Sequence, residues 1–347
     1  MSDKSPSIQE WRDLYHAAME FKKIECWNWM WDSDIFGVQN PENGEIGYCC
    51  VMGRLGEHFA LAVYLGTEGL ESYLKVQSEE VSPYSIDVPL DQKCLMASFE
   101  DREFLQKEDF QVIRRLGLKF RGRNAWPLFR SHQPGYFPWY LTSEEAKYLT
   151  IALQQTIEVA LRFKDDPKML IPPAKNRYLV RVPKKEKDGL RWRDEWLSPH
   201  PLKKKKTVAK PIDVNRLEKI KRTILQRRGV WEIDFFYLPQ PVGKKGERPY
   251  YPYVVFYVEH DSHLVLNSYL GKPAKCISEF AEQFLRFMER VKLLPQRVLV
   301  KREEAFKLLK PVTSRLGIRL RNVKRLPALE KVKASIFDSL EKMLREK

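Results

Sequence analysis

The sequence predicts an α+β protein with two domains. The first is expected to be an antiparallel sheet with helices, and the second a mixed sheet. Three observations support this prediction. The chain has 347 residues, enough for two hydrophobic cores. Short apolar strands bounded by turn residues alternate with amphipathic helices. The charge also changes sign along the chain. Residues 1–200 carry 27 Lys and Arg against 30 Asp and Glu, a net charge of −3, whereas residues 201–347 carry 34 against 16, a net charge of +18.

The N-terminal domain begins with a predicted helix over Trp11–Lys23, where apolar residues recur every three or four positions. A meander of short strands follows, because Gly, Pro and Asn separate the apolar runs and favour tight reversals. The predicted strands are Ile35–Val38, Ile46–Met52, Phe59–Leu65 and Cys94–Phe99, with helices over Thr67–Val76 and Lys107–Leu116.

A capping box begins the longest helix of this half. Thr142 is the expected N-cap, and Glu145 follows three residues later, so each can satisfy a backbone N–H of the first turn. An apolar stripe then continues to about Phe163. Tyr178–Val182 and Leu190–Leu197 are predicted to pair as a hairpin.

The domain boundary is predicted at the Pro- and Lys-rich stretch Ser198–Pro211. Proline lacks a backbone donor and adjacent lysines repel each other, so the segment is expected to be extended. The predicted organisation is a domain over 1–197, a linker over 198–212 and a basic domain over 213–347.

The basic domain is expected to open with a helix from Val214 that ends at Gly229, a residue type that often follows a helix C-terminus. The remaining elements follow as three strands, helix, strand, helix, strand and helix. Their predicted ranges are Trp231–Leu238, Tyr253–Glu259, Leu264–Tyr269, a helix capped by Ser278 and ending near Lys292, Arg297–Lys301, Glu303–Leu316, Ile318–Val323 and Leu326–Arg345.

This order, from Trp231 to the end, resembles the ribonuclease H-like fold, in which three antiparallel strands are followed by two parallel strands added through crossover helices. The whole chain also resembles an uncharacterised bacterial family with two domains of unknown function. The residues that carry this second resemblance are Phe36-Gly37-Val38, Pro41-Glu42, Gly44-Glu45, Gly47-Tyr48, Arg248-Pro249-Tyr250 and Pro252.

The ribonuclease H-like resemblance implies positions for catalytic carboxylates, because two Mg²⁺ or Mn²⁺ ions would need oxygen ligands. Asp234 matches the first position, and Glu330 lies in the closing helix. Glu303 and Glu304 match the middle position loosely, because Lys301 stands where an acidic residue is expected. A cation there opposes metal binding. The favoured prediction is therefore a non-catalytic fold without a metal or cofactor, in which Asp234 lies at a strand edge in water and Glu303 and Glu304 suit a helix N-terminus.

Basic side chains suggest contact with a polyanion. Phosphate contacts by Lys and Arg release counterions and favour binding at low salt. The alternative is that these charges are simply solvated. No sequence-reading motif accompanies them, so any nucleic-acid contact is expected to be weakly sequence-specific. The candidate residues are Arg216, Lys219, Arg222, Arg227, Arg228, Arg319 and Arg321.

Other candidate sites favour structural roles. The segment from Glu259 to His263 holds two histidines but is expected to be a hairpin turn between strands, not a metal site. The five cysteines form no Cys-x-x-Cys pair, which predicts buried, reduced thiols in the cytoplasm. The sequence contains no run of eighteen apolar residues, so no membrane helix is predicted. Met1–Gln9 lacks the apolar segment of a secretory signal.

The leading functional hypothesis is a non-enzymatic cytoplasmic binding protein of unknown pathway, whose basic C-terminal domain contacts nucleic acid or an acidic protein. Two alternatives remain open, a metal-dependent nuclease or transposase-like enzyme and a protein–protein adaptor. The sequence does not indicate an oligomeric state.

Overall fold

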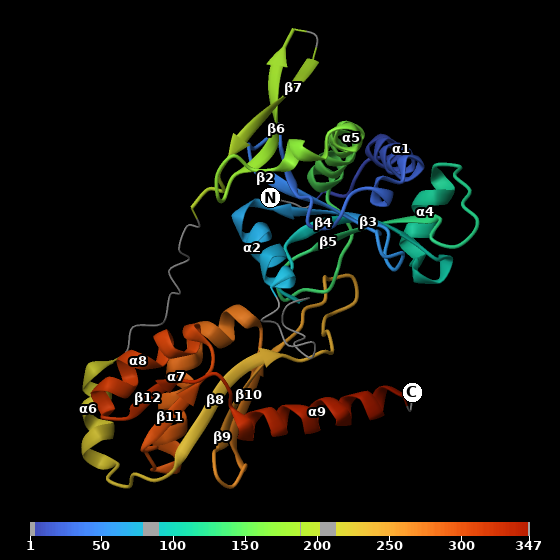
Figure 1. The fold of residues 1–347 in the computed structure, drawn as a ribbon. Helices are drawn as coiled ribbons and strands as arrows, with labels where there is room; N and C mark the ends of the chain where they lie inside the picture. Colours follow the sequence, from blue (N-terminus) through green and yellow to red (C-terminus); the bar gives the residue numbers. More distant parts are fainter. Residues whose placement is uncertain (1–3, 79–89, 188, 202–212, 346–347) are drawn as a thin grey trace. The chain divides into compact units, whose positions relative to one another are not determined.

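The computed structural model describes residues 4–78, 90–187, 189–201 and 213–345. The chain divides into two compact units, Met1–Lys203 and Lys204–Lys347 (Figure 1). Most of the predicted linker at 198–212 lies outside the described residues. Among the helices that are described, none combines the length and apolar character that crossing a membrane requires.

Unit 1 is built on a seven-stranded sheet with the order β5-β4-β3-β2-β1-β6-β7. Neighbouring strands are antiparallel except β1 and β6, which are parallel. The predicted antiparallel sheet with helices is confirmed, with one parallel pair, because β6 returns to the sheet after a long helix and not through a tight turn. The strands are β1 (Phe36–Gln39), β2 (Ile46–Met52), β3 (Ala60–Leu65), β4 (Cys94–Glu100), β5 (Trp126–His132), β6 (Tyr178–Glu186) and β7 (Gly189–Leu197).

The edge strand β5 was not predicted from the sequence. It contains Pro127 in the run Trp-Pro-Leu-Phe-Arg-Ser-His, and a proline argues against a strand in the interior of a sheet. An edge strand tolerates proline because only one of its sides must pair. β5 pairs with β4 along its whole length and buries alternate residues.

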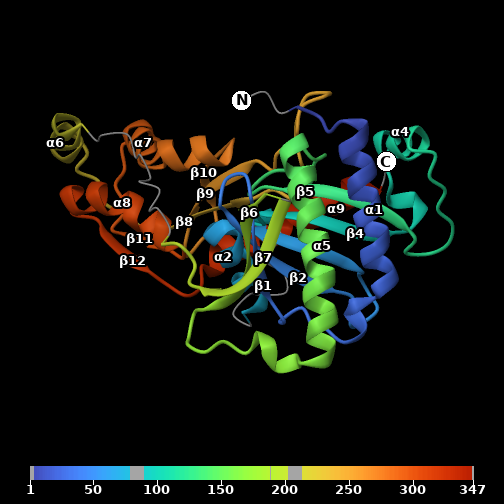
Figure 2. The same ribbon diagram turned by 90° about the horizontal axis from the view of Figure 1, so that it is seen from above.

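Helices cover both faces of this sheet. α1 and α5 lie side by side on one face (Figure 2), and α2 packs on the other. Cys49 belongs to the first core and Cys50 to the second, as the alternation of side chains along a strand requires. All five cysteines are buried and unpaired, as predicted. The helices are α1 (Ile8–Ile24), α2 (Gly66–Gln77), α4 (Lys107–Arg115) and α5 (Ser143–Asp165), with short 3₁₀ turns η1 (Cys26–Asn28), η2 (Arg102–Phe104) and η3 (Pro167–Leu170).

Unit 2 is built on a five-stranded mixed sheet with the order β10-β9-β8-β11-β12. β8, β9 and β10 are antiparallel neighbours, and β11 and β12 run parallel to β8. The predicted order of strands and helices is confirmed. The elements are α6 (Val214–Thr223), β8 (Val230–Tyr237), β9 (Tyr253–Glu259), β10 (Val265–Gly271), α7 (Pro273–Val291), β11 (Arg297–Val300), α8 (Glu303–Leu316), β12 (Arg319–Asn322) and α9 (Pro327–Arg345).

Two predicted helix ends in unit 2 were wrong. α6 ends at Thr223 and does not reach Gly229, because the backbone of residues 226–228 pairs with Leu294. The N–H of Leu294 donates to the Gln226 carbonyl and the N–H of Arg228 to the Leu294 carbonyl, each at 3.0 Å. α7 begins at Pro273, before Ser278, since proline is favoured at the first helical position.

Strand β8 is the centre of unit 2, and its two faces differ in chemistry. Trp231 and Phe235 point to α7, where they contact Phe284, Phe287 and Phe280. Glu232, Asp234 and Phe236 point to the opposite face, where the Phe236 ring contacts Phe337 of α9. Two acidic side chains therefore face the interior on the α9 side.

Glu10 joins the two long helices of unit 1, and its titration predicts how acid weakens the fold. Its carboxylate accepts hydrogen bonds from the Ser7 backbone N–H at 2.7 Å and the Ser143 hydroxyl at 2.8 Å, and pairs with Lys147. Burial raises the pKa of Glu10, but these hydrogen bonds outweigh it and lower the pKa to about 2. The folded-state pKa lies below the ordinary value of 4.5, so the stabilisation is present above that pH and is lost as pH falls toward 2.

We therefore expect Glu10→Gln to lower the free energy of unfolding at pH 7 by about 1–2 kcal/mol, after allowance for solvent screening. The difference from the unsubstituted chain should shrink between pH 4.5 and pH 2. Urea unfolding at several pH values measures it, with the exposed Glu57→Gln as control. A difference that does not change with pH would contradict the role of this carboxylate.

Candidate anion-binding site

Asp234, the best match to a catalytic carboxylate, is buried in the central strand and is only 8% exposed. The prediction that it lies at a strand edge in water was wrong, because β8 is the middle strand of the five-stranded sheet and Asp234 pairs with Phe256 of β9. Arg302, the N-cap residue of α8, places its Nε 3.3 Å from Asp234 Oδ1. A guanidinium thus balances the charge of this carboxylate from within the fold.

The other candidate carboxylates also have partners on their own elements or neighbouring ones. Glu303 and Glu304 lie in the first turn of α8, as predicted, and Glu303 accepts a hydrogen bond from Asn322 Nδ2 at 3.1 Å. Glu330 pairs with Arg325 at 2.9 Å, and Lys301 is exposed. In the part of the chain that the structure describes, no three His, Cys, Asp or Glu side chains come together as metal ligands.

Sequence analysis did not single out Glu232, the most buried carboxylate among the described residues of unit 2. Its side chain is fully buried, with Oε1 2.5 Å from His260 Nδ1, and Oε2 accepts the backbone N–H of Leu329 at 2.8 Å. His260 lies in the turn between β9 and β10, which confirms that the Glu259–His263 segment is a hairpin turn. The signal in the sequence was an acidic residue between Trp231 and Ile233 in an apolar strand.

The predicted nucleic-acid contacts separate into structural and accessible residues. Arg216 bonds to Glu282 at 2.8 Å and to Glu289 at 2.6 Å, and the hydrogen bond from Arg216 lowers the pKa of Glu289. Arg216 therefore holds α6 on α7 and is neutralised. Lys219 and Arg222 are exposed on α6, and Arg228, Arg319 and Arg321 are also exposed.

Three arginines converge at the amino ends of the parallel strands. They line a hollow of about 350 Å³, called here the arginine hollow, which is formed by Arg227, Gln296, Arg297, Gly317 and Arg319. Arg227 and Arg319 are among the predicted contacts, whereas the sequence indicates Arg297 only as the start of a strand. The sequence leaves these arginines far apart, and the parallel pairing of β11 with β12 brings them together.

Each arginine of the hollow is held in a different way. Arg227 donates from Nη2 to the Leu316 carbonyl at 2.8 Å and from Nη1 to the Gly317 carbonyl at 3.3 Å, and so caps the C-terminus of α8. Arg297 and Arg319 are register partners on β11 and β12. Neighbouring strands are about 4.8 Å apart, so these two like charges repel each other.

No described residue balances this repulsion. Within the described ranges, neither Arg297 nor Arg319 forms an ion pair with an acidic side chain. Guanidinium groups present planar sets of N–H donors that match the oxygens of phosphate or carboxylate. The hollow is therefore suited to an oxyanion that is shared between two arginines.

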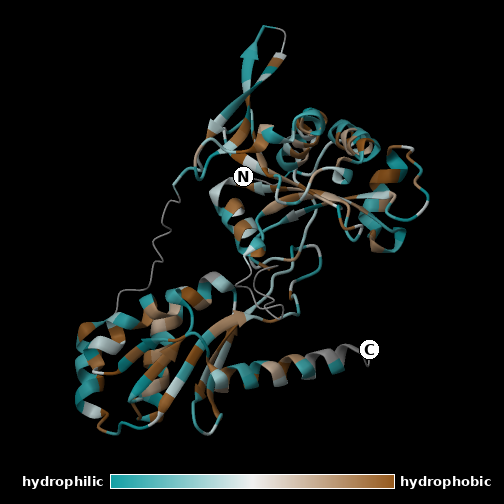
Figure 3. Cartoon of the chain, viewed as in Figure 1, coloured by the Kyte–Doolittle hydropathy of each residue, from teal (hydrophilic) through white to brown (hydrophobic). Residues whose placement is uncertain are grey.

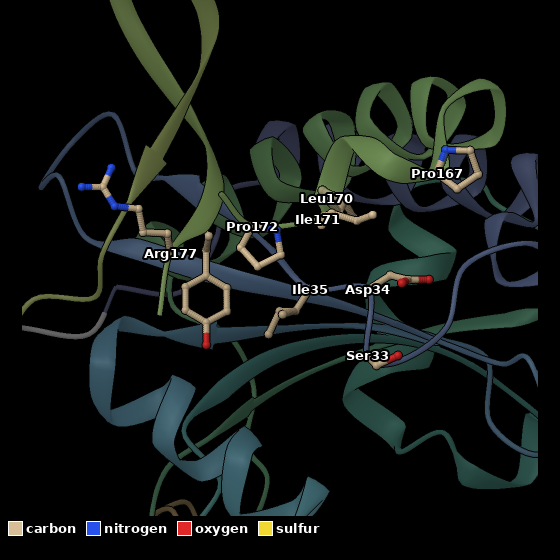
Figure 4. A pocket seen from close by; sticks show the side chains of 9 residues that line it. Ser33, Asp34, Ile35, Pro167, Leu170, Ile171, Pro172 and Arg177 are labelled. Atoms are coloured by element: carbon tan, nitrogen blue, oxygen red, sulfur yellow. The ribbon is translucent and has the colours of Figure 1, made fainter. Parts of the chain in front are cut away.

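Unit 1 has a hollow of about 320 Å³ between η3, the start of β6 and the loop before β1. Figure 4 shows that the Arg177 side chain lies at one end and Asp34 at the other, with Pro172 and Ile35 between them. Asp34 accepts the Trp31 backbone N–H at 2.7 Å, and Arg177 donates to the Trp196 carbonyl at 3.4 Å. The two charged groups do not converge on one point, so this hollow is less suited to binding a charged ligand than the arginine hollow is.

Comparison with known families agrees with the division into two units. Residues 11–181 match the family model described as Domain of unknown function (DUF7309), and residues 216–337 match Domain of unknown function (DUF6930). Together the two matches are consistent with a two-domain family of unknown function, as the resemblance indicated. No curated protein matches the chain. The arginine hollow lies wholly within the second matched domain.

The Asp234–Arg302 pair predicts the result of a stability experiment. Arg302→Ala should lower the free energy of unfolding by about 2 kcal/mol, because a buried carboxylate loses a charged partner. Adding Asp234→Asn should restore part of this loss, since no buried charge then remains. Urea unfolding of the two single variants and the double variant measures the coupling, and simple additivity of the two single effects would show that the pair is unimportant.

Proposed function

We propose that the chain is a non-enzymatic nucleic-acid-binding protein whose arginine hollow holds a backbone phosphate. The single observation that carries this proposal is the register pairing of Arg297 with Arg319, which lack an acidic partner among the described residues. Two guanidinium groups at strand spacing suit one phosphate, and an anion between them would remove their repulsion.

The surroundings of the hollow favour a polyanion over a single small anion. Arg321 follows Arg319 on the same face of β12, and the residues from 201 onward carry a net charge of +18. Each further phosphate contact strengthens binding at low salt. Because backbone contacts carry no sequence information, we expect weak sequence preference. A nucleic-acid partner also agrees with the expectation of a cytoplasmic protein with reduced cysteines.

The repulsion in the hollow leads to a prediction about stability. Arg297→Gln should leave stability unchanged or raise it by up to about 1 kcal/mol in buffer without multivalent anions, because it removes a like-charge pair. The unsubstituted chain should gain thermal stability from inorganic phosphate or triphosphate, and the variant should gain less. Thermal unfolding across a series of anion concentrations measures both effects. An equal anion effect in the two proteins would argue against a bound anion here.

Nucleic-acid binding is tested by fluorescence anisotropy with labelled single- and double-stranded DNA and RNA, in a salt series without divalent metal. The double variant Arg297→Gln, Arg319→Gln should bind at least about tenfold more weakly and show a salt slope smaller by about 1, because the two arginines share one phosphate. Arg227 is left unchanged because it caps α8.

The matched control removes two exposed lysines from unit 2, Lys275→Gln and Lys331→Gln. It loses the same charge and should bind nearly as well as the unsubstituted chain. Equal losses in both double variants would show a diffuse charge effect and no defined site. Absence of binding at low salt would overturn the proposed function and direct the search to an acidic protein partner.

A further inference from the structure

The hairpin of β6 and β7 extends beyond the sheet of unit 1 as a two-stranded ribbon (Figure 1). β6 pairs with β1 only at Val180 and Arg181. Beyond Arg181 the two strands pair only with each other, from Val182 with Arg193 to Glu186 with Gly189. We call residues 182–187 and 189–193 the ribbon tip. At about 3.3 Å per residue, its five paired positions reach about 17 Å from the sheet.

The base of the ribbon is fixed to α5 by a network of charges around the buried Arg181 side chain. The Arg181 side chain, only 9% exposed, donates to Gln155 at 2.9 Å, to Glu158 at 2.6 Å and to Asp194 of the opposite strand at 2.7 Å. Arg162 of α5 also pairs with Asp194 at 2.6 Å. The ribbon therefore leaves the sheet in one defined direction, and a partner would not have to order it.

The ribbon tip is basic although unit 1 is acidic. Residues 182–193 carry five Lys and Arg against two Asp and Glu, a net charge of +3, whereas residues 1–200 as a whole have a net charge of −3. Figure 3 shows the hydrophilic colouring of the outer end of β6. The Arg191 side chain is 77% exposed, and Lys184, Lys185 and Lys187 are exposed without an ion pair to any described residue.

We propose that the ribbon tip is an arm that enters the major groove of duplex DNA. This inference adopts the nucleic-acid partner of the proposed function but concerns a different surface. The major groove of B-form DNA, about 12 Å wide, admits a two-stranded β-ribbon, whereas the deep, narrow major groove of duplex RNA does not. Lys184 and Arg191 are register partners, so their side chains extend from the same face of the ribbon. Phosphates line both sides of the groove, where these two cations could contact them.

The test compares the full chain with the variant Lys184→Gln, Lys185→Gln, Lys187→Gln, Arg191→Gln on a DNA duplex and on an RNA duplex of the same sequence. Anisotropy should show at least about tenfold weaker DNA binding by the variant and a salt slope smaller by about 3. Its affinity for the RNA duplex should change less. The matched control is an equal loss of charge on α4 and the loop after it, through Arg115→Gln, Lys119→Gln, Arg121→Gln and Arg123→Gln.

Groove occupancy gives a second readout. The unsubstituted chain should protect guanine N7, which lies in the major groove, from methylation, and the ribbon variant should lose this protection. Unchanged DNA affinity, unchanged protection or an equal loss in the control would each overturn the inference.

The two sets of variants distinguish this inference from the proposed function. If only the Arg297 and Arg319 variant weakens binding, the ribbon proposal fails and the proposed function stands. If only the ribbon variant weakens binding, the arginine hollow is not the nucleic-acid-binding site. If the chain binds no nucleic acid, both fail.

Discussion

The need to provide polar partners for two carboxylates on the inward face of β8 is the constraint on which unit 2 depends. A carboxylate withdrawn from water is costly unless a cation or hydrogen-bond donors compensate it. Glu232 is compensated by His260 and by the first turn of α9, and Asp234 by Arg302 at the start of α8. The strand thereby ties the β9–β10 turn, α8 and α9 to the centre of the sheet.

This arrangement separates the internal charges of unit 2 from its accessible charges. Asp234 is balanced inside the fold by Arg302, and Arg216 is balanced by two glutamates of α7. Arg297 and Arg319 lie at the amino ends of their strands and are not balanced by any described carboxylate. The position of a basic residue relative to acidic side chains, and not its place in a run of positive charge, decides whether its charge is balanced within the fold.

Unit 1 follows the same logic with the opposite overall charge. Its long helices and the ribbon base use ion pairs that are internal to the fold, such as those of Arg181 and Asp194. Exposed positive charge lies beyond that network, where the ribbon leaves the sheet, and also on α4 and the loop after it. In both units, acidic side chains neutralise some basic residues, such as Arg181 and Arg216, whereas other basic side chains stay exposed without an ion pair to a described residue.

Local patterns in the sequence determined most of the elements. The capping box at Thr142 and Glu145, the apolar strand at Tyr253–Glu259 and the alternation at Cys49 and Cys50 depend only on near neighbours, so they could be predicted. The predictions were wrong where backbone pairing with a segment distant in sequence overrides the local sequence preference for helix, turn or strand. Pairing with Leu294 replaces the predicted end of α6 at Gly229, and β5 forms despite Pro127 because it lies at an edge.

The sequence by itself also determined that the positive charge is concentrated after residue 200, because net charge follows from the number of acidic and basic residues alone. Only the tertiary structure decided which of those charges are accessible. Arg216 looks like its neighbours in the sequence but is held by two glutamates more than sixty residues away. Arg297 and Arg319 become neighbours only because β11 and β12 pair in parallel. Ion pairing and strand register join residues that are distant in the chain, and no local pattern records those distances.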